Sequence, residues 1–318
     1  MRKEKYLITF CYFETFNSKI NLKYFLKKGL IKSDEVFFIF IIKGLLSINI
    51  PEYENVKIIK IDNEGYDFGG YTVALNYVNI NDYDFFIFLN DSVRGPFIPL
   101  YCDDPWYKYF TSKLSNDIIL SGSTINSKVN DPKNYIQCKH IQSSSFCLNK
   151  KGIQLLNEEN FFDKEKLLSY DIKNKKSEKI RLINDYEIGM SKIILDNNYK
   201  IQSLLLSEYK GLKNGDIQYN LRYYDDTLNP FETIFIKTNR MKNKTIENYT
   251  FFFTNLFDNK LSFYQNYKFG YKSKKKKLIL FIFFGLIFIN YFFINNPLIN
   301  TINIFENYFH FYKIRYFF

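Results

Sequence analysis

Short runs of apolar residues recur along the N-terminal part of the chain and predict buried strands. They are rich in β-branched and aromatic residues and are bounded by turn residues, as strands are. Most are apolar at successive positions rather than at alternate ones, which is typical of strands covered on both faces. The runs are Lys5–Phe13, Glu35–Ile42, Asn55–Asp62, Tyr83–Asn90 and Asp117–Thr124.

Segments with helical spacing separate these runs, for example Asn21–Leu30 and Gly69–Val78. Strands that alternate with helices predict an α/β fold with a mostly parallel sheet flanked by helices. Further on, Ile136–Leu156 is expected to form two strands and a helix, and Asn184–Leu205 a capped helix and a strand. We expect this globular domain to span residues 1–240.

The C-terminal part has a different pattern. Leu278–Ile294 is 17 residues long, with Asn290 as its one strongly polar residue, at the short end of the roughly 17–25 residues that cross a bilayer. A single transmembrane helix is expected at 278–294, after a juxtamembrane segment at 241–277 and before a short tail at 295–318. A buried core helix is the alternative. The run Lys274–Lys277 precedes the span, so the positive-inside rule predicts a cytosolic domain.

Composition and charge change this picture little. The formal net charge of +11 would suit a nucleic acid or an anionic membrane, but the lysines are mostly scattered and no nucleic-acid-binding motif is present, so we expect no nucleic-acid partner. A bias toward Asn, Lys, Ile, Tyr and Phe accounts for much of the charge. The four cysteines and two histidines lack zinc spacing.

The end of the fourth strand carries the first candidate chemistry, in "NDSVRGP", Asn90–Pro96. In parallel sheets ligands bind beyond the carboxyl ends of the strands. Asp91 can hold a divalent cation that neutralises a diphosphate, and Arg94 can donate to phosphate oxygens. Alternatively, Asp91 caps a turn closed by Gly95 and Pro96.

The stretch "NEGYDFGGY", Asn63–Tyr71, follows the third strand. Its glycines fit neither a dinucleotide fingerprint nor a Walker A motif. Gly69 and Gly70 would let a ligand approach the backbone just after Asp67, at the start of a helix. A helix-capping Asp67 is the alternative.

The chain resembles a known family in an ordered set of blocks. It is similar to GT-A-type glycosyltransferases related to the rhamnan synthesis protein F group over about residues 5–240. The "NEGYDFGG" and "LNDSVRGP" blocks are the specific ones, and the other blocks are "NLKYFLKKGL", "HIQSSSFCLNKKGIQLL", "DYEIGMSKIIL" and "NPFETIFIKTNR".

The resemblance implies a GT-A-like Rossmann-type fold and a nucleotide-diphosphosugar donor. In GT-A enzymes a D-x-D motif at the end of an inner strand binds a metal and the diphosphate. Asn90, Asp91 and Ser92 match its place but keep one acid, so Mn²⁺ or Mg²⁺ held by Asp91 is an open expectation. By the same resemblance, Thr9 and Tyr12 at the first strand's exit would lie beside the nucleoside.

The resemblance also implies an acidic pair, Asp185 and Glu187, near the acceptor. One of them would take the proton of the attacking hydroxyl. Asn184 and Glu187 also form a capping-box-like pair, so Asp185 is preferred as the base. His140 begins a block that resembles the acceptor-side strand, where it would bind phosphate or sugar, although a lone histidine is more often structural.

Two functions follow. The first is a membrane-anchored glycosyltransferase acting on a hydroxyl of a glycan or lipid-linked acceptor. The second, suggested by the single acid at Asp91, is a catalytically silent sugar-nucleotide-binding scaffold at a membrane.

Overall fold

The computed structural model describes residues 3–99, 101–126, 132–168, 175–205, 229–240 and 243–255. Met1–Thr254 form one compact unit. In the described part of the chain no helix is long and apolar enough to cross a membrane. The transmembrane helix predicted at 278–294 and the lysine run before it lie outside the described residues.

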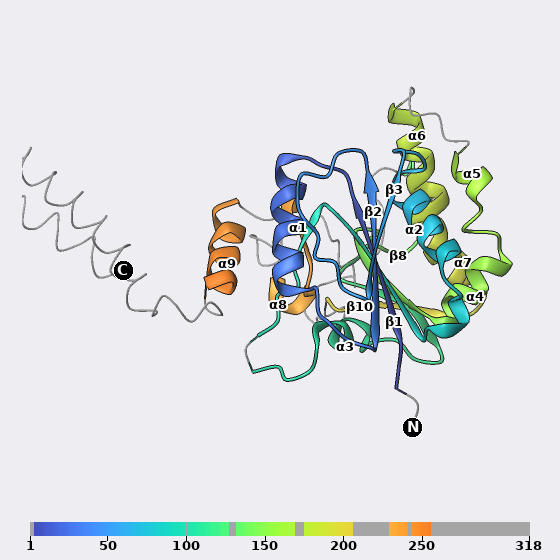
Figure 1. Cartoon of the computed structure of the whole chain (residues 1–318). Helices are drawn as coiled ribbons and strands as arrows, with labels where there is room; N and C mark the ends of the chain where they lie inside the picture. The colour runs from blue at the N-terminus through green and yellow to red at the C-terminus, as the bar shows by residue number, and fades with distance from the viewer. Residues whose placement is uncertain are drawn as a thin grey trace, which may run out of the picture. The chain divides into compact units, whose positions relative to one another are not determined.

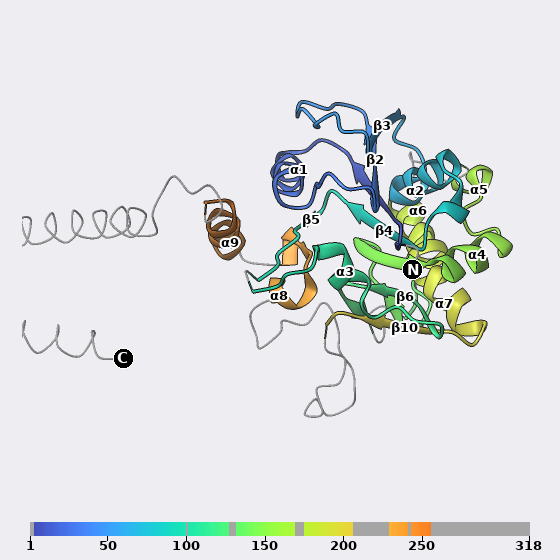
Figure 2. The ribbon, with the colours of Figure 1, turned by 60° about the horizontal axis from the view of Figure 1, so that its bottom comes forward.

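The predicted mostly parallel sheet is confirmed. In the described residues it has seven strands in the order β10-β6-β9-β4-β1-β2-β3, and Figure 2 shows it running from β3 at the top to β10 at the bottom. Every neighbouring pair is parallel except those of β9, which is antiparallel to β4 and to β6. The bounds are β1 Tyr6–Tyr12, β2 Val36–Lys43, β3 Val56–Ile61, β4 Phe85–Asn90, β6 Ile118–Gly122, β9 Ser145–Asn149 and β10 Lys200–Ser203.

Helices cover both faces of the sheet, as expected for α/β folds. Figure 1 shows α1 on one side and α2, α4, α5, α6 and α7 on the other. The helices are α1 Phe16–Lys28, α2 Tyr66–Tyr77, α3 Trp106–Thr111, α4 Lys150–Glu158, α5 Lys164–Leu168, α6 Lys175–Leu182, α7 Gly189–Asp196, α8 Pro230–Thr233 and α9 Asn243–Asn255. The short elements among the described residues are β5 Val93–Arg94, β7 Ile125–Asn126, β8 His140–Ile141, β11 Ile236–Lys237, η1 Ile80–Asp82, η2 Ile183–Ile188 and η4 Thr238–Arg240.

The central strands are buried on both faces, which explains their unbroken apolar runs. Leu7 and Cys11 of β1 belong to the core under α2. Ile8 and Phe10 of the same strand belong to the core under α1. Since alternate residues of a strand point to opposite faces, the parity of a position decides which layer its side chain meets.

Two helices begin earlier than the sequence predicts, one because of a capping box and the other because of a glycine conformation. Helix α1 begins at Phe16, earlier than the predicted Asn21, because Thr15 and Ser18 form a capping box. Helix α2 begins at Tyr66, because Gly65 adopts a left-handed conformation with φ of 62° and so ends the preceding loop.

Candidate functional site

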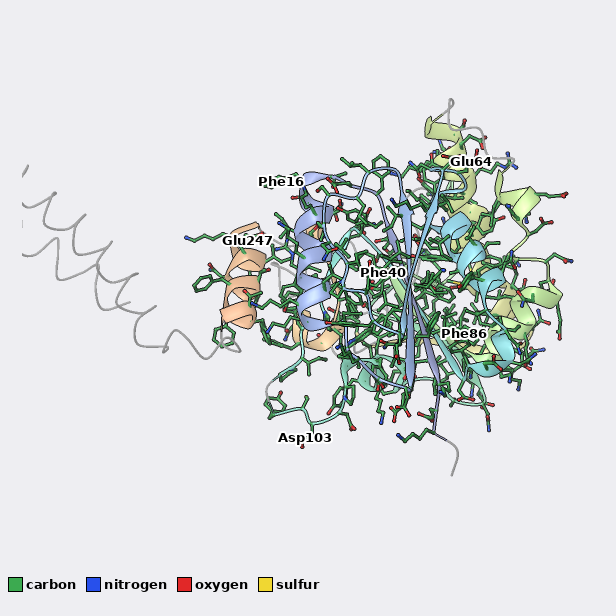
Figure 3. The ribbon with its side chains drawn as sticks, in the orientation of Figure 1. Phe16, Phe40, Glu64, Phe86, Asp103 and Glu247 are labelled. Carbon is green, nitrogen blue, oxygen red and sulfur yellow. The ribbon has the colours of Figure 1, made fainter. Side chains whose placement is uncertain are left out.

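The candidate site lies at the carboxyl edge of the parallel strands. Strands β1, β2 and β4 are parallel neighbours that end at Tyr12, Lys43 and Asn90, so their exit loops meet at one edge. Figure 3 shows Phe16, just after β1, and Glu64, just after β3, at this edge, with Asp103 at the opposite edge. The sheet therefore gathers the predicted donor residues that follow strands.

Asp91 is tied to the loop between β1 and α1. Its Oδ2 accepts a hydrogen bond from the backbone N–H of Phe13 at 2.6 Å, and Asn21 Nδ2 donates to its carbonyl at 2.8 Å. Burial raises the pKa of Asp91 to about 7, with a further rise from the charge of Asp67 and opposing effects of the Phe13 N–H and Lys43. Asp91 is thus a carboxyl that changes protonation near neutral pH.

Asn90, Ser92 and Asp67 form a linked group beside Asp91. Asn90 Nδ2 donates to Asp67 Oδ2 at 2.9 Å. Asn90 Oδ1 accepts from the backbone N–H and the hydroxyl of Ser92 at 3.1 and 2.5 Å. These bonds join the end of β4 to the start of α2, and the predicted alternative that Asp67 caps α2 is wrong, because that helix has no side-chain cap.

The Arg94 side chain does not bond to Asn90, Ser92 or Asp67 but to residues of α1 and α9. Its side chain is 2% exposed, and Nε donates to Asn21 Oδ1 at 2.9 Å. Nη1 donates to Glu247 Oε1 at 2.8 Å and to Thr250 Oγ1 at 2.9 Å. The guanidinium therefore links α1 to α9, and its predicted role at the donor phosphate stays a prediction.

The glycines of α2 have a packing reason in the protein itself. A Cβ on Gly70 would lie 2.5 Å from Cys11 Sγ, and one on Gly69 would lie 2.6 Å from the carbonyl oxygen of Glu64. Both distances are too short for real Cβ atoms, so each glycine allows α2 to pack closely against protein atoms. Their predicted approach to a ligand stays a prediction.

Thr9 and Tyr12 point to opposite faces of β1. Thr9 is fully buried in the middle of the strand, and its hydroxyl has no hydrogen-bond partner in the described residues. Tyr12 belongs to the core under α1, and its hydroxyl donates to Glu14 Oε2 at 3.2 Å. The structure does not bring these two side chains together, and their nucleoside contact stays a prediction.

Sequence reasoning missed Lys43, the last residue of β2. Its side chain is buried at 2% exposure, and its Nζ has no hydrogen-bond partner among the described residues. Its positive charge lowers the pKa of Asp91 and of Cys11, although burial raises the Cys11 pKa well above its ordinary value. The signal in the sequence was a lysine that ends an otherwise apolar run, "VFFIFIIK".

A second polar cluster forms around Glu187, in the π-helical segment η2. Glu187 Oε2 accepts from the backbone N–H of Ser143 at 3.2 Å and forms a short hydrogen bond with the Ser143 hydroxyl. Its Oε1 lies 4.0 Å from Nε2 of the buried His140. Single π-turns within helices frequently occur at functional sites.

His140 is held in one orientation by two neighbours. Its Nδ1 lies 2.8 Å from the carbonyl oxygen of Cys138, and its Nε2 lies 3.3 Å from Asn126 Nδ2. A carbonyl can only accept, so this contact assigns a proton to Nδ1.

The two acidic residues of η2 separate in space. Asp185 Oδ2 lies 3.7 Å from Arg181 Nε, whereas Glu187 faces the loop before β9. That loop also reaches the end of β4, because Asn90 N–H donates to the Ser144 carbonyl at 3.1 Å. The predicted capping pair of Asn184 and Glu187 is wrong, since the Asn184 side chain bonds to the backbone of Ile136 and Asn134 instead.

The described residues do not assemble a resident metal site. Across the described ranges no three His, Cys, Asp or Glu side chains gather in a way that would hold a metal ion. The charge of Asp67 raises the pKa of Asp91, so the two carboxyls interact, but Asp67 accepts a hydrogen bond from Asn90. Mn²⁺ or Mg²⁺ held by Asp91 together with a diphosphate therefore stays a prediction.

A broad depression of about 1030 Å³ lies at the opposite edge of the sheet. Its lining includes Lys32, Glu35, Val36, Tyr53 and Asn55, around the beginnings of β2 and β3. Parallel strands present their amino ends there, whereas ligands of such sheets bind beyond the carboxyl ends. It is large, but it is not the candidate site.

Comparison with known proteins gives a family and several distant structures. The model of the family described as "Rhamnan synthesis protein F" matches residues 52–272. No curated protein matches. The chain is similar at 10% identity to the apo-form glycosyltransferase GlyE of Streptococcus pneumoniae TIGR4, covering 65% of this chain and 46% of that one with a TM-score of 0.34.

A second similar structure is Staphylococcus aureus TarS 1–349 in complex with UDP. The identity is 13%, the coverage 62% of this chain and 56% of that one, and the TM-score 0.33. The chain thus spans about half the length of the GlyE and TarS structures. The family match, which covers more than half of the chain, carries the assignment.

Proposed function

The chain belongs to the rhamnan synthesis protein F family, and we propose on that basis that it is a glycosyltransferase. In this proposal it moves a sugar from a nucleotide-diphosphosugar donor to a hydroxyl of a glycan or lipid-linked acceptor. The family is one of polysaccharide synthesis by its description, and glycosyl transfer is the reaction that extends a polysaccharide.

The observation that carries the proposal is Asp91 at the carboxyl edge. Its carboxyl is partly buried, has a pKa raised to about 7 and lies beside the exits of β1 and β4. Such a group has two ways to meet the diphosphate of a donor. As an acid it would donate a hydrogen bond to phosphate, and as a carboxylate it would help to hold a divalent cation, Mn²⁺ or Mg²⁺, that neutralises the diphosphate.

Glu187 is the proposed base, in preference to Asp185. The acceptor oxygen forms a bond to the anomeric carbon as the bond from that carbon to the diphosphate oxygen breaks. The hydroxyl proton passes to the Glu187 carboxylate, and the nucleoside diphosphate leaves. Glu187 is favoured because its carboxylate reaches the loop that joins the end of β4, while Asp185 pairs with Arg181.

The test is donor turnover by the purified full chain. Sugar nucleotides of uridine, guanosine, cytidine and thymidine are supplied with and without Mn²⁺, and release of nucleoside diphosphate is followed. We expect slow release from one donor even with water as the acceptor. Release from none of them, with or without a glycan acceptor, would contradict the proposal.

Two substitutions of Asp91 separate its proposed roles. Asp91→Leu removes both the hydrogen bond and the cation ligand, so turnover should be lost. Asp91→Asn keeps a hydrogen-bond donor but weakens a cation site, so its turnover should survive only if phosphate is bound directly. Equal turnover by both variants and the wild type would exclude Asp91 from the site.

A silent sugar-nucleotide-binding scaffold is the second candidate. It is favoured by the single acid of the Asn90–Ser92 stretch, where Asp91 stands between an amide and a hydroxyl. This candidate predicts that a sugar nucleotide binds and stabilises the protein by mass action, yet is never consumed. Binding without turnover for every acceptor tried would favour the scaffold.

The membrane location also belongs to the proposal. The apolar segment 278–294 and the preceding lysines support a single C-terminal anchor with the enzymatic domain on the cytosolic side. Carbonate extraction of membranes tests this idea. The full chain should stay in the pellet and a chain ending at residue 277 should be released, while release of both would contradict an anchor.

A further inference from the structure

The ammonium group of Lys43 is buried inside the protein. The side chain is 2% exposed, and Nζ has no hydrogen-bond partner in the part of the chain that the structure describes. A buried ion without a partner is costly, so buried lysines are normally paired. Lys43 is the last residue of β2 and lies at the carboxyl edge of the sheet, where Asp91 follows the end of β4.

The start of α2 runs alongside this side chain. A Cβ on Gly70 would lie 3.3 Å from Lys43 Cε, so the lysine stem packs against the beginning of the helix. The helix is 12 residues long, and its N-cap, Gly65, supplies no side-chain hydrogen bond to the first turn. Backbone N–H groups at such a terminus favour an anion.

Two features thus favour negative charge near one place. One is the ammonium of Lys43, which has no hydrogen-bond partner among the described residues, and the other is the start of α2, which has no side-chain cap and carries one acidic residue, Asp67, in its first turn. No ion pair joins Asp91 to Lys43 among the described residues, although the charge of Lys43 lowers the pKa of the Asp91 carboxyl. An anion from outside the chain would supply the hydrogen-bond partner that the described residues do not give to Lys43.

We propose that Lys43 binds the diphosphate of a ligand at the carboxyl edge of the sheet. For the donor this rests on the proposed function. The same chemistry occurs in a nucleoside diphosphate and in a lipid diphosphate, such as a lipid-linked acceptor carries. Lys43 is a binding residue in this account, because a point charge on a flexible stem suits phosphate.

The matched control is Lys60, which lies one ladder step from Lys43. Lys60 pairs with Ile42 on the neighbouring strand, while Lys43 pairs with Ile61, and Lys60 is exposed. Lys43→Met and Lys60→Met each remove one lysine charge from the same pair of strands. Methionine keeps the unbranched stem, so packing changes little.

The first measurement is the melting temperature of the unliganded full chain in detergent. Lys43→Met should melt at the same temperature as the wild type or higher, because it removes a buried charge that has no partner. A marked fall in melting temperature would show that Lys43 has a structural partner in the protein and would overturn the proposal.

The second measurement is calorimetric titration with inorganic pyrophosphate, nucleoside diphosphates and farnesyl diphosphate. Wild type and Lys60→Met should bind at least one of them equally, and Lys43→Met should bind it at least about tenfold more weakly. Unchanged affinity in Lys43→Met, or no binding of any diphosphate to the wild type, would overturn the proposal.

The same titrations separate this inference from the proposed function. If a nucleoside diphosphate binds wild type and Lys43→Met equally, the donor site stands and the role of Lys43 fails. If only farnesyl diphosphate binds, and does so through Lys43, the role of Lys43 stands on the acceptor side and the donor assignment fails.

Discussion

The carboxyl edge at Lys43 and the cluster around Glu187 differ in how their polar groups are paired. At the edge, Lys43 Nζ and the buried hydroxyl of Tyr71 have no hydrogen-bond partner in the described residues. Around Glu187, by contrast, Ser143 and His140 each have hydrogen-bond partners. Buried groups without partners are exceptions that need an explanation. The proposed ligand would account for the groups without partners at the edge, while Glu187 already has hydrogen-bond partners within the protein.

The largest effect should come from removing the carboxylate of that organised cluster. Glu187→Gln should lower the rate of transfer by about 10²- to 10⁴-fold, the usual contribution of a general base. Asp185→Asn is the matched control and should leave most of the rate, because its partner is Arg181. Single-turnover transfer with the active donor measures both. The reverse ranking would return the base role to Asp185.

The protonation of Asp91 gives the next effect, on stability. Its pKa is raised to about 7 in the folded protein, above the roughly 3.9 of an unfolded chain. The proton therefore stabilises the folded state below about pH 4, and this contribution is lost as the pH rises to about 7. Asp91→Asn lacks it, so its stability relative to wild type should grow by about 2 kcal/mol or more between pH 4 and pH 8.

Denaturant unfolding of both proteins at each pH measures that difference, in which other titrating groups cancel. The Asp91→Asn variant can keep the hydrogen bond from the Phe13 N–H, because the oxygen of the introduced amide also accepts. The comparison therefore isolates the charge of the carboxylate. A difference that does not vary with pH would mean that Asp91 ionises normally.

Arg94 should contribute to stability rather than to ligand binding. Its bonds to Asn21, Glu247 and Thr250 link α1 to α9, so Arg94→Met should lower the free energy of unfolding by about 1–3 kcal/mol. Glu247→Gln should cost less, because Glu247 is 55% exposed. Urea unfolding measures both. Loss of diphosphate affinity with unchanged stability would instead restore the phosphate role predicted for Arg94.

The smallest effect should come from the residue that orients the base. Ser143→Ala removes one of the two bonds to Glu187 Oε2 and keeps the bond from the backbone N–H. We expect kcat to fall by about tenfold with KM little changed. An unchanged kcat would mean that Ser143 does not act through Glu187.

The fold was largely predictable from sequence, because its signals are local. The runs that became β1 to β4 are apolar without alternation, and burial on both faces explains this pattern. The prediction of where a helix begins was less accurate. The buried polar residues Ser18 and Asn21 in α1 bond to loop residues outside the helix, and no periodicity reveals such bonds.

The position of the candidate site in the sheet was predictable from sequence, but the hydrogen-bond partners of its side chains were not. Asp91 falls at a strand exit because its strand ends there, which sequence shows. The hydrogen bonds of Asn90 to Asp67 and of Arg94 to Glu247 in α9 join segments that are far apart in the chain, so the sequence does not reveal them. Lys43 was missed because a lysine at the end of a strand is usually exposed, whereas this one is buried.

The proposed ligand should bind at the carboxyl edge rather than in the broad depression at the other edge. Hydrogen exchange of the full chain with and without the sugar nucleotide that it turns over tests this directly. We predict slower exchange in peptides containing Phe13, Tyr66–Phe68 and Asp91, and no change in those covering Lys32–Val36 and Glu52–Asn55. Protection confined to the second pair of segments would contradict the account.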